Sequence, residues 1–519
     1  MPITRWRWWA ALAGLAVCVF SVVALSGPGR IEIVDGETRY EVARSLVEHG
    51  DPAIRDPDVW FAVFPGRDGR LYTTYRLPQS AAGAVAIIVA DATGPATEAR
   101  RKFFFTLVGA AACGLLALCY ATWFRQHGHS PKQALLWAMG GILCTPAWFY
   151  GASTFDDVLG ALAVVLAIAL AAASRELRRP ALVATLAGLA LGIAFNCKQP
   201  LGVFVLPVLA ASHDPRRRMR AQTGTYACVL AGLTLGLAVY FGYRLYCFPP
   251  GTMEANAALA ARYGPVWSTQ PPLTALAALL FSAGTGVLLY CPPLVLSVLG
   301  VGSWWRSDRD FCAALLTAAG VFTCFIACLT FFKGDPAWGP RYLTPVIAAL
   351  WLIAPAGARV LRRHTSATLL ALGAVVQLLA LSVDPIRLYI EQGLPVNAGR
   401  ADPAIYFNPR ISHLFNRPRE ILQIATRGGQ RRPDLSISLP TLDSPGKGSG
   451  AVVGRRVFRM PNTFRPWWAT RQPLGVDSGR TALLLIVIFA IGIRLQTWGA
   501  AGNRVAGAAG VAAGPAAGA

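Results

Sequence analysis

Charged residues are scarce in this chain. Only 14% of its 519 residues are Asp, Glu, Lys or Arg, whereas 54% are hydrophobic and the mean hydropathy is +0.46. Because soluble domains usually carry about 25% charged residues, this composition excludes an ordinary soluble fold. Apolar segments of roughly 17–25 residues, the length that crosses a bilayer, recur from end to end. The sequence therefore predicts an all-α polytopic membrane protein.

Acidic residues and histidine are also few. The chain has 26 Asp and Glu against 48 Lys and Arg, which gives a net charge of +22 and a pI near 10.1. No basic stretch alternates with aromatic residues as a nucleic-acid surface would need, so we expect anionic membrane lipids as partners and no nucleic acid. With six His, a His-ligated metal is not expected, although a divalent metal held in another way stays open. No glycine-rich phosphate loop indicates a nucleotide cofactor.

The 11 cysteines follow no pattern of a disulfide framework or of a metal site. All of them lie in or at the edges of apolar segments. We interpret them as small hydrophobic residues that pack between helices.

About twelve membrane spans can be drawn along the chain. They run approximately over 8–26, 103–124, 133–150, 157–174, 181–196, 200–212, 223–246, 284–304, 311–331, 342–360, 366–383 and 481–497. The first span begins with basic residues, as a signal peptide does, but it lacks a clear cleavage site and is interpreted as an uncleaved helix.

Basic residues in alternate short loops predict the orientation of these spans. They are Arg5, Arg7, Arg125, Lys132, Arg175, Arg178, Arg179, Arg216, Arg217, Arg218, Arg220, Arg306, Arg309, Arg359, Arg362 and Arg363. The positive-inside rule places these loops, and with them both termini, in the cytoplasm.

Two long loops then lie outside the cytoplasm. The first, 27–102, belongs to a transmembrane core that spans 1–383, and it contains an apolar stretch suited to the membrane interface. The second, 384–480, contains alternating stretches typical of a small β element. The last helix, 481–497, precedes a low-complexity tail, 498–519, that we predict to be a disordered cytoplasmic segment.

Acidic residues follow the first span directly, in "IVDGETRYEVARSLVEHGD" (33–51). Asp35 could cap the following helix, with Glu37 favoured in its first turn. Alternatively, a carboxylate held where the membrane meets water could take a proton from a hydroxyl. The two interpretations are compatible, because a helix end is also a rigid support.

Further candidate residues lie in four other segments predicted to be external. Each also has a structural interpretation: interfacial anchoring for aromatic and basic residues, and helix capping for acids. Acids so close to hydrocarbon are costly unless they face a polar cavity, and Arg341 is a cation on the side that the topology rule disfavours. The candidates are Tyr75 and Arg76, Asp156 and Asp157, Lys198, and Arg341 with Tyr342.

These stretches together resemble a known group of enzymes. "DGETRY", "RLYTTYRLPQS", "TFDDVLGAL", "GIAFNCKQPLGVFVLP", "GPRYLTPVIAALWL" and "YFNPRISHLFNRPREIL" are similar, in order and predicted side, to motifs of the GT-C superfamily of polyprenyl-phosphate-sugar glycosyltransferases. The likeness is greatest to the branch of protein O-mannosyltransferases and lipid A aminoarabinose transferases, glycosyltransferase family 39. The resemblance implies a GT-C-like helical bundle. The Ala-, Gly- and Arg-rich composition indicates a bacterial source, so we expect the protein in the inner membrane of a bacterium.

The resemblance also implies roles for the candidates. Asp35 would be the catalytic base with Glu37 in reserve, since Gly36 separates an acidic pair that is adjacent in most relatives. Asp156 would be the second acid, with Asp157 as its substitute. Arg76 would bind the lipid phosphate. Further contacts with the donor phosphate or sugar would come from Lys198, Arg341, Tyr342, Asp157 and Tyr75.

The expected reaction moves a sugar, with inversion, from a polyprenyl-phosphate carrier to a hydroxyl on a glycan, lipid or protein acceptor outside the cytoplasm. Two alternatives stay open. A twelve-helix secondary transporter would place its charges near the membrane midplane. An enzyme similar to O-antigen ligases or polymerases would use late-loop residues such as Arg410 and Arg417.

Overall fold

The structure is a computed structural model that is almost entirely helical, which confirms the predicted fold class. It describes the chain except for residues 1, 60, 178, 217–218, 250–264, 335–336, 393–401, 428–435, 443–451, 460–462, 470–473 and 502–519. All eleven cysteines are free, as the sequence indicates. The predicted tail falls mostly outside the described residues, and its first residues belong to the last helix.

The first half of the chain forms ten α-helices, one 3₁₀ helix and one β-hairpin within the described residues. In order, these are α1 (Pro2–Ser26), α2 (Val34–His49), β1 (Val63–Pro65), β2 (Leu71–Thr73), α3 (Leu77–Ala92), α4 (Glu98–Gln126), α5 (Pro131–Leu143), α6 (Ala147–Gly151), α7 (Asp157–Ala173), α8 (Pro180–Cys197), η1 (Gln199–Phe204), α9 (Val205–Ser212) and α10 (Met219–Cys247). The strands β1 and β2 pair antiparallel, with Phe64 opposite Tyr72.

The second half contains shorter helices and a second hairpin. Its core elements are α12 (Pro272–Phe281), α13 (Val287–Tyr290), α14 (Leu294–Ser307), α15 (Arg309–Ala327), η2 (Arg341–Leu343), α16 (Thr344–Trp351), α17 (Ala354–Ala358) and α18 (Arg363–Ser382). The late loop and the last helix comprise α19 (Ile386–Gln392), η3 (Pro403–Phe407), η4 (Pro409–Ile411), α21 (His413–Arg427), β3 (Ser436–Leu442), β4 (Val452–Arg459), η5 (Trp467–Ala469) and α22 (Ser478–Ala501). Strands β3 and β4 form the expected β element of this loop.

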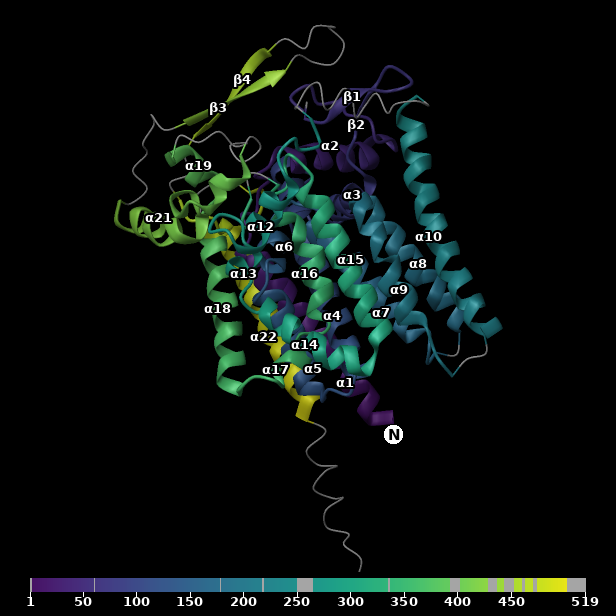
Figure 1. Ribbon diagram of the computed structural model, residues 1–519. Helices are drawn as coiled ribbons and strands as arrows, with labels where there is room; N and C mark the ends of the chain where they lie inside the picture. The colour runs from purple at the N-terminus through teal and green to yellow at the C-terminus, as the bar shows by residue number, and fades with distance from the viewer. Residues whose placement is uncertain are drawn as a thin grey trace, which may run out of the picture.

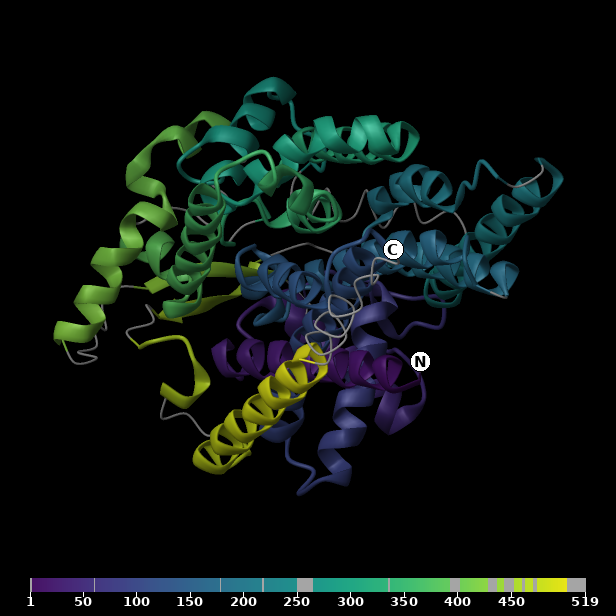
Figure 2. The same ribbon diagram turned by 90° about the horizontal axis from the view of Figure 1, so that it is seen from below.

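The long loops share one end of the molecule. Both hairpins lie at the end opposite to the start of α1 and the finish of α22 (Figure 1). Helices α1 and α22 pack against each other, with Gly14 next to Gly492. Helices α10 and α21 occupy opposite flanks of the bundle (Figure 2). This arrangement agrees with the predicted topology, in which both long loops lie on one side of the membrane and both ends of the helical core lie on the other. The identity of the cytoplasmic side still rests on the basic loops.

Seven helices in the described part of the chain are long and apolar enough to cross a membrane. Several predicted spans are instead broken at or next to proline, which cannot donate its backbone nitrogen to a helix. The span 133–150 divides into α5 and α6 before Pro146, and 284–304 divides into α13 and α14 at Pro292 and Pro293. The span 342–360 divides into η2, α16 and α17. The count of twelve spans therefore stays a prediction.

Aromatic donors satisfy the backbone where the helices break. The Trp123 indole on α4 donates to the carbonyl of Leu352, at the junction of α16 and α17, over 3.1 Å. The Tyr120 hydroxyl donates to Ala348 over 3.0 Å. Since an unpaired carbonyl within a bilayer costs several kcal/mol, these bonds stabilise a broken helix in the core.

Glycines let α8 and α10 touch along their backbones. A Cβ on Gly188 would lie 1.9 Å from the Val229 carbonyl oxygen, and one on Gly232 would lie 2.0 Å from the Thr185 oxygen. Close contact through small residues is a common way for membrane helices to associate. The contact fixes α10 beside the end of α8, where Lys198 follows.

Replacing Gly232 by Val should separate these helices, because its side chain would overlap the backbone of α8. We expect a loss of roughly 1–3 kcal/mol, as for other overpacked sites, seen as a lower midpoint of thermal unfolding in detergent. Gly224→Val on the same helix is the matched control, since a Cβ there meets nothing within 4 Å. Equal midpoints for the two variants would contradict the close contact.

Candidate active site

Asp35 lies in the first turn of α2, beside a cation from a distant part of the chain. Its Oδ2 is 3.7 Å from Nη2 of Arg341, which begins η2. The N-cap of α2 is Ile33 and has no side-chain cap bond, so Asp35 does not act as the expected cap. Its side chain is 18% exposed and also accepts a hydrogen bond from Tyr75.

Asp157 contacts Arg341 as well, and it also contacts Lys198 from another segment of the chain. Arg341 donates through Nε to Oδ2 of Asp157 over 2.8 Å, and the Lys198 ammonium donates to Oδ1. Asp157 begins α7 and is 0% exposed. Lys198 has extended backbone between α8 and η1, where Pro200 in the first turn of η1 favours a new start. One buried carboxylate thus holds two of the three predicted phosphate-binding cations, Lys198 and Arg341.

Asp156 contacts Lys198 as well, and it adds a third cation, Arg39, to these residues. Its Oδ2 accepts a hydrogen bond from Nη2 of Arg39 over 3.0 Å, and its Oδ1 is 3.7 Å from the Lys198 nitrogen. Asp156 precedes α7 but makes no capping bond. We call the cluster formed by Asp35, Arg39, Tyr75, Asp156, Asp157, Lys198, Arg341 and Tyr342 the central cluster.

Aromatic rings pack against all three cations of the central cluster. The Arg341 guanidinium lies 3.7 Å from the ring centre of Phe155, and that of Arg39 lies 4.3 Å from the ring centre of Tyr75. The Lys198 nitrogen lies 4.8 Å from the ring centre of Tyr342. Such contacts exclude water and strengthen when the cation is desolvated.

The environment fixes two protonation states. Burial, followed by the charge of Asp35, raises the pKa of the Tyr75 hydroxyl well above its ordinary value, so Tyr75 keeps its proton and donates it. Burial alone would raise the pKa of Asp156, but Arg39, Lys198 and Arg341 hold that pKa below its usual range. Asp156 is therefore ionised at neutral pH.

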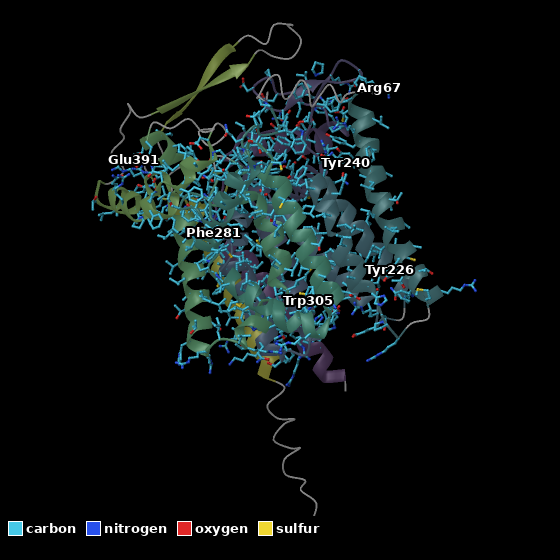
Figure 3. The ribbon with its side chains drawn as sticks, viewed as in Figure 1. Arg67, Tyr226, Tyr240, Phe281, Trp305 and Glu391 are labelled. Atoms are coloured by element: carbon cyan, nitrogen blue, oxygen red, sulfur yellow. The ribbon has the colours of Figure 1, made fainter. Side chains whose placement is uncertain are left out.

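Arg76 lies in a second group beside the central cluster. Its guanidinium donates to the Tyr240 hydroxyl on α10 over 2.8 Å and to the Thr74 carbonyl, while Gln199 donates to the same hydroxyl. Tyr240 lies on the side of the molecule where α2 and α3 are found (Figure 3). The two groups are adjacent along the chain, because Tyr75 precedes Arg76 and Lys198 precedes Gln199.

Glu37 points away from the central cluster. Its Oε2 is 2.9 Å from the nitrogen of Lys102, in an ion pair with the start of α4. The glycine between the two acids has a packing reason: a Cβ on Gly36 would lie 2.5 Å from Oγ1 of Thr154. Gly36 therefore lets the first turn of α2 approach the segment before α7 that carries the second acid.

Arg39 is the member of the cluster that sequence reasoning did not select. It lies one helical turn after Asp35, within the "GETRY" stretch, and residues four apart share a helix face. That spacing was the available signal. Within the described residues, no three His, Cys, Asp or Glu side chains gather as a metal site would need, and metal dependence stays open.

Comparison with known proteins gives similarity of structure only. No protein-family model and no curated protein matches the sequence. The chain is similar to ArnT from Cupriavidus metallidurans bound to undecaprenyl phosphate, with a TM-score of 0.48 and 13% identity over 81% of this chain and 80% of that chain. It is similar to apo ArnT as well, with a TM-score of 0.45 and 14% identity over 82% and 80%.

A third similar structure is the archaeal oligosaccharyltransferase AglB from Archaeoglobus fulgidus, in complex with an inhibitory peptide and a dolichol-phosphate. The TM-score is 0.41 and the identity 12%, over 77% of this chain and 59% of that chain. At these values the likeness concerns the course of the backbone. The side-chain contacts above are what bear on the chemistry.

Asp157→Asn should destabilise the protein much more than Asp35→Asn. Removing one partner of a buried charge pair costs roughly 3–5 kcal/mol, since the remaining cations stay buried without compensation. Asp35 is partly exposed and its contact with Arg341 is long. Thermal unfolding of both variants in detergent measures the difference. An unfolding midpoint for Asp157→Asn equal to that of the wild type would contradict the role of Asp157.

Proposed function

We propose that this protein is an integral membrane glycosyltransferase that moves a sugar from a polyprenyl-phosphate carrier to an acceptor hydroxyl on the extracytoplasmic side. The observation that carries the proposal is the contact of Asp35 with Arg341 in a cluster that also holds Lys198. A base next to cations is what transfer from a phosphate to an alcohol requires. The motif resemblance of the same residues supports this assignment.

Asp35 is the acid best placed to act as the base. Asp157 is fully buried and accepts hydrogen bonds from two cations, and Asp156 is buried and accepts a hydrogen bond from Arg39. Neither has a free approach for a hydroxyl. Asp35 keeps an exposed portion, its contact with Arg341 is long, and its hydrogen bond comes from a neutral group, the Tyr75 hydroxyl. A base must reach the proton that it removes, and this geometry favours Asp35.

Lys198 and Arg341 would stabilise the leaving phosphate. Asp157 occupies only one of the donors of each, namely an ammonium hydrogen of Lys198 and Nε of Arg341. Nη1 of Arg341 also donates to the Gly334 carbonyl over 3.4 Å. Nη2 of Arg341, which makes only the long contact with Asp35, and the other ammonium hydrogens of Lys198 can point at phosphate oxygens as negative charge develops on them. The aromatic rings around the cations keep the local dielectric low, which strengthens this interaction.

The proposed step is a single displacement. The acceptor oxygen attacks the anomeric carbon while Asp35 takes the hydroxyl proton, and the bond from the anomeric carbon to the phosphate oxygen breaks. The electron pair leaves with the polyprenyl phosphate. Because attack and departure occur on opposite faces of the sugar, the anomeric configuration inverts.

The second group extends the site toward the membrane. Arg76 precedes α3, the apolar helix of the first loop, and its Nε is buried with no hydrogen bond. We assign Arg76 to the phosphate of the lipid carrier, whose chain would lie among the apolar helices. The sugar and the acceptor, whether lipid, glycan or protein, are left to experiment.

Asp35→Asn should abolish transfer while the protein stays folded in the membrane. Loss of a general base lowers rates by about 10²–10⁴-fold. The assay is mass analysis of envelope lipids and glycans from cells that lack the protein, complemented with the wild type or a variant. Glu37→Gln is the control and should complement, because Glu37 pairs with Lys102.

Complementation by Asp35→Asn would reject the base. Loss of the product only when Arg410 is replaced would favour the alternative similar to O-antigen ligases. No missing glycan or lipid in the deletion strain, together with solute uptake by vesicles that contain the protein, would favour a transporter.

A further inference from the structure

The late-loop stretch 463–469 is fixed to the ends of two helices. The backbone nitrogen of Arg465 donates to the Ser382 carbonyl at the end of α18 over 2.9 Å, and that of Trp467 donates to Gly27 over 3.0 Å. The Trp467 indole donates to Ala24 of α1 over 2.9 Å. These hydrogen bonds fix the backbone of 463–469, so a side chain that points inward from this stretch has a defined position.

The side chain of Arg465 projects into the protein, where it is only 1% exposed. Its Nε is 3.0 Å from Oε2 of Glu32, and its Nη2 donates to the Ala152 carbonyl over 3.3 Å. The guanidinium also lies 4.7 Å from the ring centre of Phe149. One late-loop residue thus contacts two segments of the transmembrane core.

Each contacted segment carries a member of the proposed site. Glu32 lies three residues before Asp35. Phe149 and Ala152 precede Phe155, whose ring supports Arg341, and the two acids that follow it. Arg465 therefore contacts the segment that leads to the proposed base, Asp35, and the segment that leads to Asp156 and Asp157.

A second late-loop arginine contacts the third segment of the site. Arg417 on α21 is fully buried, and its guanidinium lies 5.3 Å from the ring of Trp338, three residues before Arg341. Helix α21 and the labelled Glu391 of α19 lie on the flank opposite to Tyr240 (Figure 3). The late loop thus supports the central cluster from the side that faces away from the Arg76 group.

We infer that Arg465 is a positioning residue, which sets the place of Asp35 and of the segment before α7 for the proposed transfer reaction. The inference rests on the proposed function. A buried ion pair is a poor device for stability alone, since apolar residues of similar volume are often as stable. Its two hydrogen-bonded contacts instead fix two chain segments at a defined separation. A displacement of about 1 Å at a reacting group can cost 10²-fold in rate.

The pair formed by Glu32 and Arg465 gives this role a distinct pH signature. The pKa of Glu32 is raised to about 7, chiefly by burial; the charges of Arg465 and Arg30 oppose this rise, and the charge of Asp384 adds to it. As the pH falls through 7, Glu32 gains a proton and loses its charge interaction with Arg465. The turnover number should therefore fall over this range if the pair positions the base.

The test measures kcat and KM in liposomes, with the polyprenyl-phosphate-sugar fraction from cells that lack the protein as donor and the envelope fraction of the same cells as acceptor. Arg465→Gln should lower kcat about 10–100-fold with KM within about threefold, because groups are displaced rather than removed from the substrate. Arg465→Lys keeps the charge and should recover part of the loss. Arg480→Gln, at an exposed pair with Asp477 near the start of α22, is the control and should match the wild type.

Glu32→Gln gives the decisive pH readout. Between pH 6 and 8 its kcat should be flat and equal to the low-pH level of the wild type. Wild-type kcat in Arg465→Gln, a loss confined to KM, or a wild-type pH profile in Glu32→Gln would overturn the inference. If Arg465→Gln does not fold, Arg465→Lys and Glu32→Gln carry the test. Failure of the proposed function is distinct, because the wild-type protein would then transfer no sugar in this assay.

Discussion

The site depends on one buried carboxylate. Asp157 begins α7, where no solvent reaches it, and binds Lys198 from the end of α8 and Arg341 from η2. A buried cation without a partner is strongly unfavourable, so Asp157 is what permits two cations at the edge of an apolar bundle. Lys198 and Arg341 are 41 and 184 residues away from Asp157 in sequence, so these contacts also bring distant segments of the chain together. Asp35, Arg39 and Tyr75 are placed against this assembly.

The broken helices also allow polar groups to lie within the apolar bundle. Arg341 leads into the broken region η2–α16–α17, and the turn before it needs Gly339 at φ 59°, where a Cβ would lie 2.6 Å from the Tyr290 ring. Such irregular backbone is tolerated within a membrane only where its polar groups find partners. Trp123 and Tyr120 of α4 supply those partners. A polar site and an apolar exterior can therefore coexist in one bundle.

The central cluster lies between two different supports. On one flank, a hydrogen-bonded group of Arg76, Gln199 and Tyr240 connects the site to α10. Glycine contacts hold α10 against α8. On the other, the late loop contacts through Arg465 and Arg417 the segments that carry the base and Arg341. The Arg76 group is thus bounded by the apolar helix α10, whereas Arg465 and Arg417 connect the central cluster to the late loop.

Composition and hydrophobic runs alone determined the helical membrane class, because the bilayer restricts which sequences can cross it. The candidates Asp35, Asp156, Asp157, Lys198, Arg341, Tyr75 and Tyr342 could be selected from charge placement and motif resemblance, and the structure brings them together. Glu37 and Arg39 show the limit of this reasoning: two positions apart on one helix, they face different neighbours, Lys102 and Asp156. Only tertiary packing decides which face of a helix meets the site, and only it revealed Arg465, whose role depends on contacts across more than 400 residues of chain.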